Sequence, residues 1–202
     1  MIKKIIEFIP TPYGLLLFSV LLLIIGRIFF GKTYLNCTQI IKKHLECFKD
    51  LEGKYSIVSI LLYFIIPFFI AASLAQIRII DDDVINIVTV IISILTSMLF
   101  TMLTLILDMR KRILQDDNYD ANKAGISVKL LKETYYSIMF EILISVGILI
   151  MCFIEIFSKD YSFISSIIIY YLTFMLLMNL FMVLKRIFNV IDYDIKIQDN
   201  SQ

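Results

Sequence analysis

The chain has 202 residues, of which 59% are hydrophobic and 18% charged, and its formal net charge is +1. Soluble domains average about 45–50% apolar and about 25% charged residues, whereas here long apolar blocks give a mean hydropathy of +0.86. The near-neutral charge provides no electrostatic footprint for nucleic acid, so direct nucleic-acid binding is not expected. The composition favours an integral membrane protein over a soluble domain.

Apolar stretches long enough to cross a bilayer recur along the whole chain. A spanning helix needs about 20 predominantly apolar residues. We therefore predict an all-α, polytopic helical membrane protein with four to five transmembrane helices, which form a single membrane domain over residues 1–202. The candidate spans are 8–30, 55–77, 84–107, 134–157 and 161–184.

The first stretch is the least regular. Residues 8–30 contain Pro10 and Pro12 near their start and Arg27 near their end. An arginine side chain can reach the headgroups from such a position. A true span is expected, and an interfacial or re-entrant segment is the alternative.

Basic residues are concentrated in alternate connections. Segments 31–54, 108–133 and 185–202 are rich in Lys and Arg, whereas 78–83 has one Arg beside three Asp residues. The positive-inside rule then places the three basic segments, and with them the C-terminus, in the cytoplasm. The N-terminus lies outside if five helices span the membrane and inside if four do.

The first basic segment has a helical pattern. Between Thr33 and Leu51, the residues Ile41, Leu45 and Phe48 recur at helical spacing, which predicts an amphipathic helix on the membrane or on a partner. The only histidine, His44, lies on this lysine-rich helix, where a hydrogen-bonded or solvated side chain is the ordinary case.

Exposed cations of the cytoplasmic segments are candidates to bind a partner or the membrane surface. They are Lys42, Lys43, Arg110, Lys111 and Arg112. In the second basic segment, residues 115–125 are predicted to form a polar loop. Ser127 is predicted to cap an extension of the fourth span over residues 127–134.

The fourth span has a polar stripe, formed by Ser137, Glu141, Ser145, Cys152 and Glu155. At 100° per residue these positions stay within about 40° of one direction. A membrane carboxylate is costly and normally faces a bundle interior or water. The stripe is therefore either a pore-lining or proton-relay face, or a face whose glutamates reach the headgroups or hydrogen-bond to neighbouring helices.

The third span has a similar pattern, since Asn86, Thr89, Ser93 and Ser97 recur every three or four residues. Small hydroxylated side chains allow close helix packing, and a hydroxyl-lined channel is the alternative. Asn179 in the last span is a further buried amide that requires a partner. Together these residues are candidates for a pore lining or a helix interface.

Signatures of enzymes, metal sites and cofactors are absent from the sequence. It contains no Gly-rich phosphate loop, no Gly-x-Ser-x-Gly elbow and no His-Glu-x-x-His helix. Cys37, His44 and Cys47 lack the fourth ligand that zinc normally requires. We therefore expect no catalytic residue, no bound metal and no cofactor.

Three short runs carry a resemblance to a known class of proteins: Asp108-Met109-Arg110-Lys111-Arg112, Leu130-Leu131-Lys132-Glu133-Thr134-Tyr135-Tyr136 and Leu184-Lys185-Arg186-Ile187-Phe188. With the number of spans, they make the chain similar to small polytopic membrane subunits of bacterial antiphage defence systems. Examples are the membrane subunit of Kiwa-type defence and the accessory membrane proteins of RNA-targeting CRISPR systems. The resemblance covers the architecture of the whole chain and transfers no functional residue.

This resemblance implies a homo-oligomer in the bacterial inner membrane that responds to a cytoplasmic protein and perturbs the bilayer. The first hypothesis is accordingly a non-enzymatic membrane effector or sensor. The alternatives are a small transporter or channel subunit, which normally has an internal repeat or a broken helix, and a membrane anchor for a soluble enzyme.

Overall fold

The computed structural model describes residues 15, 18–19, 21–22, 25–26, 37–49, 53–115, 121–158 and 160–199, without the side chains of 114, 121–127 and 193–199. The chain divides into two compact units, Met1–Gln39 and Ile40–Gln202. The first apolar stretch, 8–30, falls largely outside the described residues. The second unit contains the features described below.

The described residues are almost entirely helical. The helices are α3 (Thr38–Glu46), α4 (Ile57–Ile60), the π-helical turn η1 (Leu61–Ile65), α5 (Ile66–Ile77), α6 (Asp82–Gln115), α7 (Ala121–Glu155) and α8 (Phe163–Asp199). Within these residues, four stretches are long and apolar enough to cross a membrane: Ile57–Ile77, Asp82–Ile113, Val128–Glu155 and Phe163–Asp192. The predicted all-α, multi-pass membrane fold is confirmed, and these stretches correspond to the last four predicted spans.

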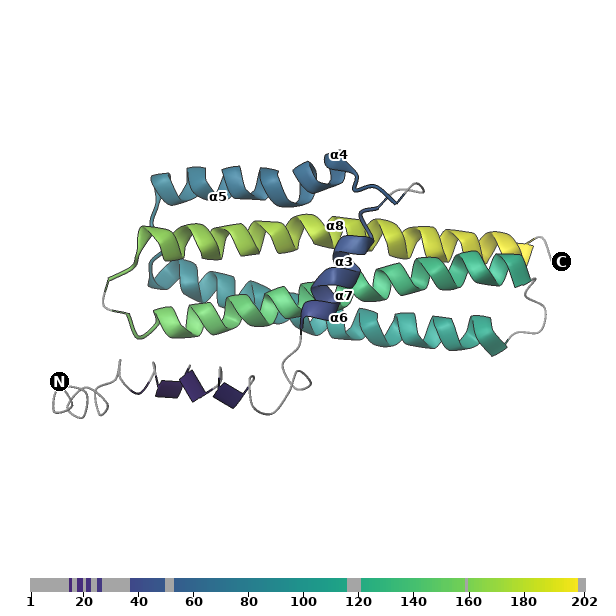
Figure 1. Ribbon diagram of the computed structural model, residues 1–202, viewed down its shortest axis with the longest axis horizontal. Coiled ribbons are helices and arrows are strands. Elements are labelled where there is room, and N and C mark those ends of the chain that lie inside the picture. The colour runs from purple at the N-terminus through teal and green to yellow at the C-terminus, as the bar shows by residue number, and fades with distance from the viewer. Residues whose placement is uncertain are drawn as a thin grey trace. The chain divides into compact units, whose positions relative to one another are not determined.

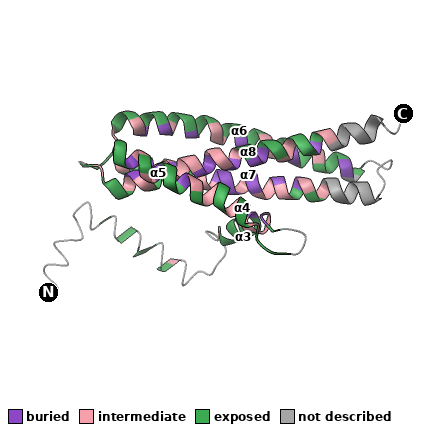
Figure 2. Cartoon of the chain, turned by 90° about the horizontal axis from the view of Figure 1, so that it is seen from above, coloured by how far each residue is buried: buried purple, intermediate pink, exposed green. Residues whose placement is uncertain are grey.

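The long helices of the second unit run side by side (Figure 1). Helix α7 packs against both α6 and α8, while α5 packs against the other side of α8. Of the 18-residue apolar stretch that defines each span, 44% is buried in α7, compared with only 11% in the α4–α5 span (Figure 2). Helix α7 is therefore the central element, and the outer helices turn wide apolar faces toward lipid.

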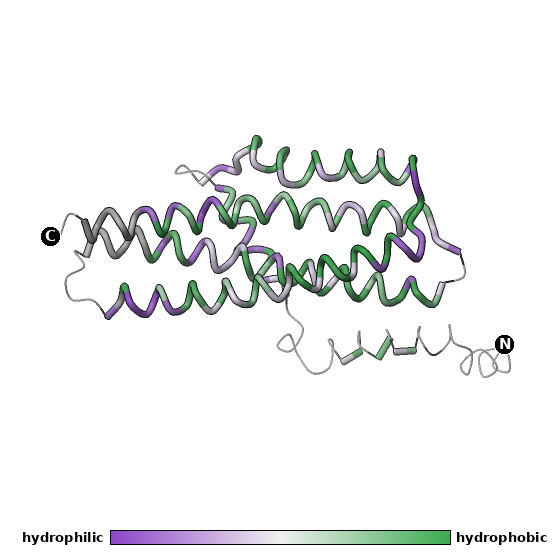
Figure 3. Tube along the Cα trace, turned by 180° about the vertical axis from the view of Figure 1, so that it is seen from behind, coloured by the Kyte–Doolittle hydropathy of each residue, from purple (hydrophilic) through white to green (hydrophobic). Residues whose placement is uncertain are grey.

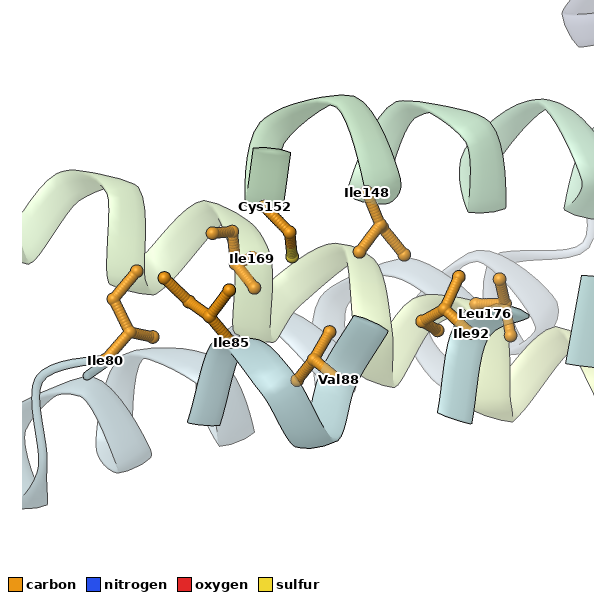
Figure 4. Close-up of a cluster of buried hydrophobic side chains, with 8 residues drawn as sticks. All are labelled: Ile80, Ile85, Val88, Ile92, Ile148, Cys152, Ile169 and Leu176. Atoms are coloured by element: carbon orange, nitrogen blue, oxygen red, sulfur yellow. The ribbon is translucent and has the colours of Figure 1, made fainter. Parts of the chain in front are cut away.

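Two apolar clusters hold the bundle together. The first, which we call the acidic-end cluster, contains Ile80, Ile85, Val88, Ile92, Ile148, Cys152, Ile169 and Leu176 (Figure 4). The second, the basic-end cluster, contains Leu99, Ile106, Ile113, Leu131, Ile138, Ile142, Val183 and Val190. Each cluster is named after the end of the bundle that it lies nearer to. The acidic end carries Asp81–Asp83, and the basic end carries Arg110–Arg112.

The α4–α5 span contains a local irregularity before Pro67. Proline lacks an N–H and its ring clashes with the carbonyl four residues earlier, here that of Tyr63. The π-helical turn η1 includes Tyr63 and widens the helix at that point. Beyond it, Ala71 and Ala75 are buried where α5 packs on α8, because small side chains four residues apart let two helices approach closely.

The short connection between α5 and α6 is fixed by side chains at the acidic end. The Asp81 carboxylate accepts a hydrogen bond from the Val84 N–H at 3.0 Å, which caps α6. This bond and the ion pair with Arg78 lower the pKa of Asp81. Tyr161 donates a hydrogen bond to Asp82, which raises the pKa of the phenol to about 12.

At the basic end the helices continue well beyond the predicted spans. Helix α7 begins at Ala121, so the prediction that Ser127 caps this helix is wrong, as is the predicted loop over its first residues. Helices α6, α7 and α8 have 34, 35 and 37 residues, or about 51–56 Å, whereas the hydrocarbon core is about 30 Å thick. Residues become more hydrophilic toward this end (Figure 3).

Candidate functional site

The polar stripe of α7 is buried inside the bundle along most of its length. Ser137, Glu141 and Ser145 are completely inaccessible, and Cys152 is 1% exposed. Glu155 is the last residue of α7 and is only partly buried at the acidic end. The structure thus separates the two predicted glutamates, because only Glu141 is enclosed by protein.

Polar residues from all three bundle helices lie near the boundary between the two apolar clusters. They are Thr96 in α6, Glu141 and Ser145 in α7 and Asn179 in α8, and we call them the polar layer. Thr96, Ser145 and Asn179 each lie between residues of the acidic-end cluster and residues of the basic-end cluster along their helices. Glu141 lies one turn away from Ser145, between Ile138 and Ile142 of the basic-end cluster. The layer is therefore closed by apolar packing toward both ends of the bundle.

Most donors of the polar layer bond to carbonyls of their own helix. Ser145 Oγ donates to the Glu141 carbonyl at 2.8 Å, and Asn179 Nδ2 donates to the Met175 carbonyl at 2.9 Å. The acceptors are not paired in this way. Both carboxyl oxygens of Glu141 and Oδ1 of Asn179 are buried without a hydrogen-bond partner among the described residues.

Among the described residues, Glu141 is the one fully buried carboxyl, and it has no hydrogen-bond partner there. A buried polar atom without a hydrogen bond costs about 1–3 kcal/mol, and a charged one costs more. Such a group can take up or release a proton, or accept a hydrogen bond from a donor brought in by rearrangement. Glu141 is therefore the centre of the candidate site.

The stripe predicted on the third span does not face this site as a unit. Asn86, Ser93 and Ser97 are exposed on the outside of α6, and only Thr89 is partly buried, against Cys152. Ser93 can face lipid because its hydroxyl donates to the Thr89 carbonyl at 2.7 Å. Within one chain, α6 and α7 therefore do not form two facing polar walls.

Helix α3 packs against the bundle through a face that includes His44. The imidazole is completely buried and stacks on the Phe140 ring, with centroids 3.9 Å apart. Phe48 is also buried, whereas Ile41 remains 41% exposed. The predicted helix is confirmed, but its buried face is rotated from Ile41 toward His44, and His44 is buried rather than solvated.

The environment of His44 strongly favours the neutral imidazole. Burial, and then the positive charge of Arg186, lower the pKa of His44 from 6.5 to about 3, while Asn179 acts weakly in the opposite direction. Among the residues that the structure describes, neither imidazole nitrogen has a partner within hydrogen-bond geometry. His44 is thus a second buried and unpaired polar group, which lies against Phe140, the residue before Glu141.

Arg186 of α8 connects α3 to the bundle. Its guanidinium donates to the Cys47 carbonyl at 3.3 Å and to Ser137 Oγ at 3.3 Å, and it lies 3.7 Å from the Glu133 carboxylate. The carbonyls at the C-terminal end of a helix attract cations. Sequence reasoning counted Arg186 only as part of a basic tail, although its position at the end of an apolar span was a usable signal.

The predicted surface cations are exposed in the structure, as binding to a partner or membrane requires. Lys42 and Lys43 lie on α3, where Lys43 pairs with Glu46 at 2.7 Å. Arg110, Lys111 and Arg112 lie on the basic-end part of α6. Among the described residues, no three His, Cys, Asp or Glu side chains gather closely enough to hold a metal ion.

The chain was also compared with known proteins. A scan against protein-family models, a search of curated proteins and a search of solved structures each found no match. The function is therefore argued from the membrane fold and the geometry of the site.

Proposed function

We propose that this protein is a non-enzymatic effector or sensor of the bacterial inner membrane, which acts as an oligomer and responds to a cytoplasmic protein. The observation that carries the proposal is the Glu141 carboxyl, completely buried in the bundle with both oxygens unpaired. An ionisable residue inside a membrane bundle is a functional group by default. A second arrangement of the helices that supplies Glu141 with a partner would regain the lost hydrogen-bond energy.

The closed bundle is the resting state of this effector. The acidic-end and basic-end clusters pack on both sides of the polar layer, so one chain at rest offers no continuous polar path along the bundle. Perturbation of the membrane therefore requires a rearrangement of α7 or the association of several chains. The exposed hydroxyls of α6 supply a face suited to such association.

The signal enters at the basic end. Helices α6, α7 and α8 extend there beyond the length that a bilayer requires. The connections at the acidic end, between α5 and α6 and between α7 and α8, are short. Because basic segments face the cytoplasm, a partner has a surface to bind on that side, and the resemblance noted above makes antiphage defence the proposed setting.

The test combines particle mass with leakage. The full-length protein is reconstituted in nanodiscs to measure its mass and in dye-loaded liposomes to measure release. We expect a defined oligomer that releases dye, and at least a tenfold loss of release in Glu141→Gln. The matched control is Glu155→Gln, which makes the same chemical change at the partly buried end of α7 and leaves release unchanged.

Other outcomes redirect the proposal. If the original protein and Glu141→Gln are both monomers that release no dye, the protein is not an autonomous effector. A membrane anchor or a partner-gated subunit is then the better explanation. Substrate-dependent flux without dye release favours the transporter alternative. If dye release falls equally in Glu141→Gln and Glu155→Gln, then Glu141 has no special role in release.

A further inference from the structure

A cavity of about 470 Å³ opens between α6 and α7 on the basic-end side of the bundle. Its inner wall is apolar and consists of Ile106 and Leu107 from α6 with Val128 and Leu131 from α7. Ile106 and Leu131 are essentially inaccessible, so this wall is continuous with the basic-end cluster. The cavity is therefore suited to hydrocarbon along this wall.

Two cations and two tyrosines complete the lining. Arg110 of α6 and Lys132 of α7 line the same cavity from opposite helices, and both side chains are exposed. Neither forms an ion pair with a carboxylate among the described residues, in contrast to Lys111, which lies 3.9 Å from Asp108. Two positive groups of this kind form a site for an anion.

The neighbouring tyrosines have the chemistry of a membrane interface. Tyr135 and Tyr136 also line the cavity, and their rings lie 5.5 Å apart in an edge-to-face arrangement. Tyrosine combines an apolar ring with a polar hydroxyl and is enriched at the level of the headgroups. The lining thus combines apolar, aromatic and cationic side chains in one cavity.

The depth of the cavity agrees with this chemistry. At 1.5 Å per residue, Arg110 lies about 42 Å along α6 from Asp82, and Lys132 about 35 Å along α7 from Glu155. A bilayer has a hydrocarbon core of about 30 Å within a total of about 40–45 Å. Both cations therefore lie beyond the hydrocarbon and within reach of the headgroups.

We propose that this cavity binds an anionic glycerophospholipid of the leaflet at the basic end. Arg110 and Lys132 hold the phosphate. The glycerol ester region and the first methylene groups of the acyl chains lie against Ile106 and Leu131, which are at a similar depth, about 36 Å along their helices from Asp82 and Glu155. Guanidinium groups bind phosphate oxygens through paired hydrogen bonds, and basic pockets between membrane helices recognise anionic headgroups. The apolar wall beside the two cations favours a lipid, which has apolar groups next to its phosphate, over a soluble phosphate. The inference rests on the membrane fold alone and is independent of the effector proposal.

The experiment is native mass spectrometry of the full-length protein in detergent with added phosphatidylglycerol or phosphatidylcholine. The test variant is Arg110→Gln with Lys132→Gln. The matched control is Lys129→Gln with Lys185→Gln, which also removes two exposed positive charges from the basic end but outside the cavity. We expect about a tenfold loss of bound phosphatidylglycerol in the test variant only, and equal phosphatidylcholine binding in all proteins.

A second variant tests the cavity without changing its charge. Val128→Phe narrows the space and keeps both cations, so phosphatidylglycerol binding should fall as well, with helicity checked by circular dichroism. Unchanged binding in Val128→Phe, or equal loss in the two double variants, would overturn the proposal in favour of general surface attraction. If soluble glycerol phosphate competes as well as added phosphatidylglycerol does, the cavity is an anion site without lipid selectivity. That result would also overturn the proposal.

Discussion

At the scale of single residues, His44 couples the packing of α3 to pH. Its pKa is about 3 in the folded protein against 6.5 ordinarily, so the unfolded or undocked state takes up a proton first as the pH falls. The contribution of His44 to the stability of the docked state is constant above pH 6.5 and declines between pH 6.5 and 3. At pH 5 the expected loss is about 2 kcal/mol, measured as a lower unfolding temperature than at pH 7.5.

The comparison that isolates this effect uses His44→Gln, which cannot titrate. The variant loses the stacking on Phe140 and is less stable at every pH, but its stability should change less between pH 7.5 and 5. The other charged groups around α3, namely Glu46, Glu133 and Arg186, are present in both proteins and cancel in the comparison. An equal pH dependence in the two proteins would contradict the assignment to His44.

The residues of the site differed in how far the sequence could reveal them. The helical period placed Glu141, Ser145 and Cys152 on one face, because i, i+4 spacing fixes a direction on any helix. His44 escaped this reasoning because its apolar partner, Phe140, is almost a hundred positions away in the chain. A polar side chain on a lysine-rich helix is assigned to water unless such a distant contact is known.

At the scale of helices, the packing of α5 on α8 depends on small side chains. Ala71 is completely buried in this interface. We expect Ala71→Leu to destabilise the protein by about 1–3 kcal/mol, because added methylene groups have no space in a packed interface. Unfolding in mixed micelles with increasing denaturing detergent measures the change.

The control for this prediction is Ser73→Leu, two residues away on the exposed face of α5. It adds a similar apolar volume toward lipid and should leave stability within about 0.5 kcal/mol of the original protein. If both variants unfold alike, the close approach of α5 and α8 does not contribute to stability.

The sequence predicted helix positions better than helix neighbours and ends. Apolar length identified the spans, but the period of α6 could not show whether Ser93 and Ser97 face another helix or lipid. The Ser93 hydroxyl, for example, donates to the Thr89 carbonyl within α6 in either case. The start of α7 was placed too late, because the residues from Ala121 onward are polar. From Val128 onward the described side chains of α7 pack against α6 in the basic-end cluster, and such distant contacts are not visible in the local sequence pattern.

At the scale of the whole molecule, the bundle is asymmetric along the membrane normal. The acidic end has short connections tied by Asp81 and Tyr161, whereas helices α6, α7 and α8 project beyond the span at the basic end. The positive-inside rule predicts that the basic end is cytoplasmic. Both the proposed partner surface and the proposed lipid cavity lie at that end, so the orientation decides which cellular molecules can reach them.

Orientation is testable with single cysteines placed at opposite ends. In a background with Cys37, Cys47 and Cys152 replaced by Ala, Ser158→Cys marks the acidic end and Gln115→Cys marks the basic end, both at exposed positions. Treating intact cells with a membrane-impermeant thiol reagent should label the Ser158→Cys protein, whereas the Gln115→Cys protein should react only after permeabilisation. The reverse pattern would place the basic end outside the cell, and no cytoplasmic partner could then act on these helices.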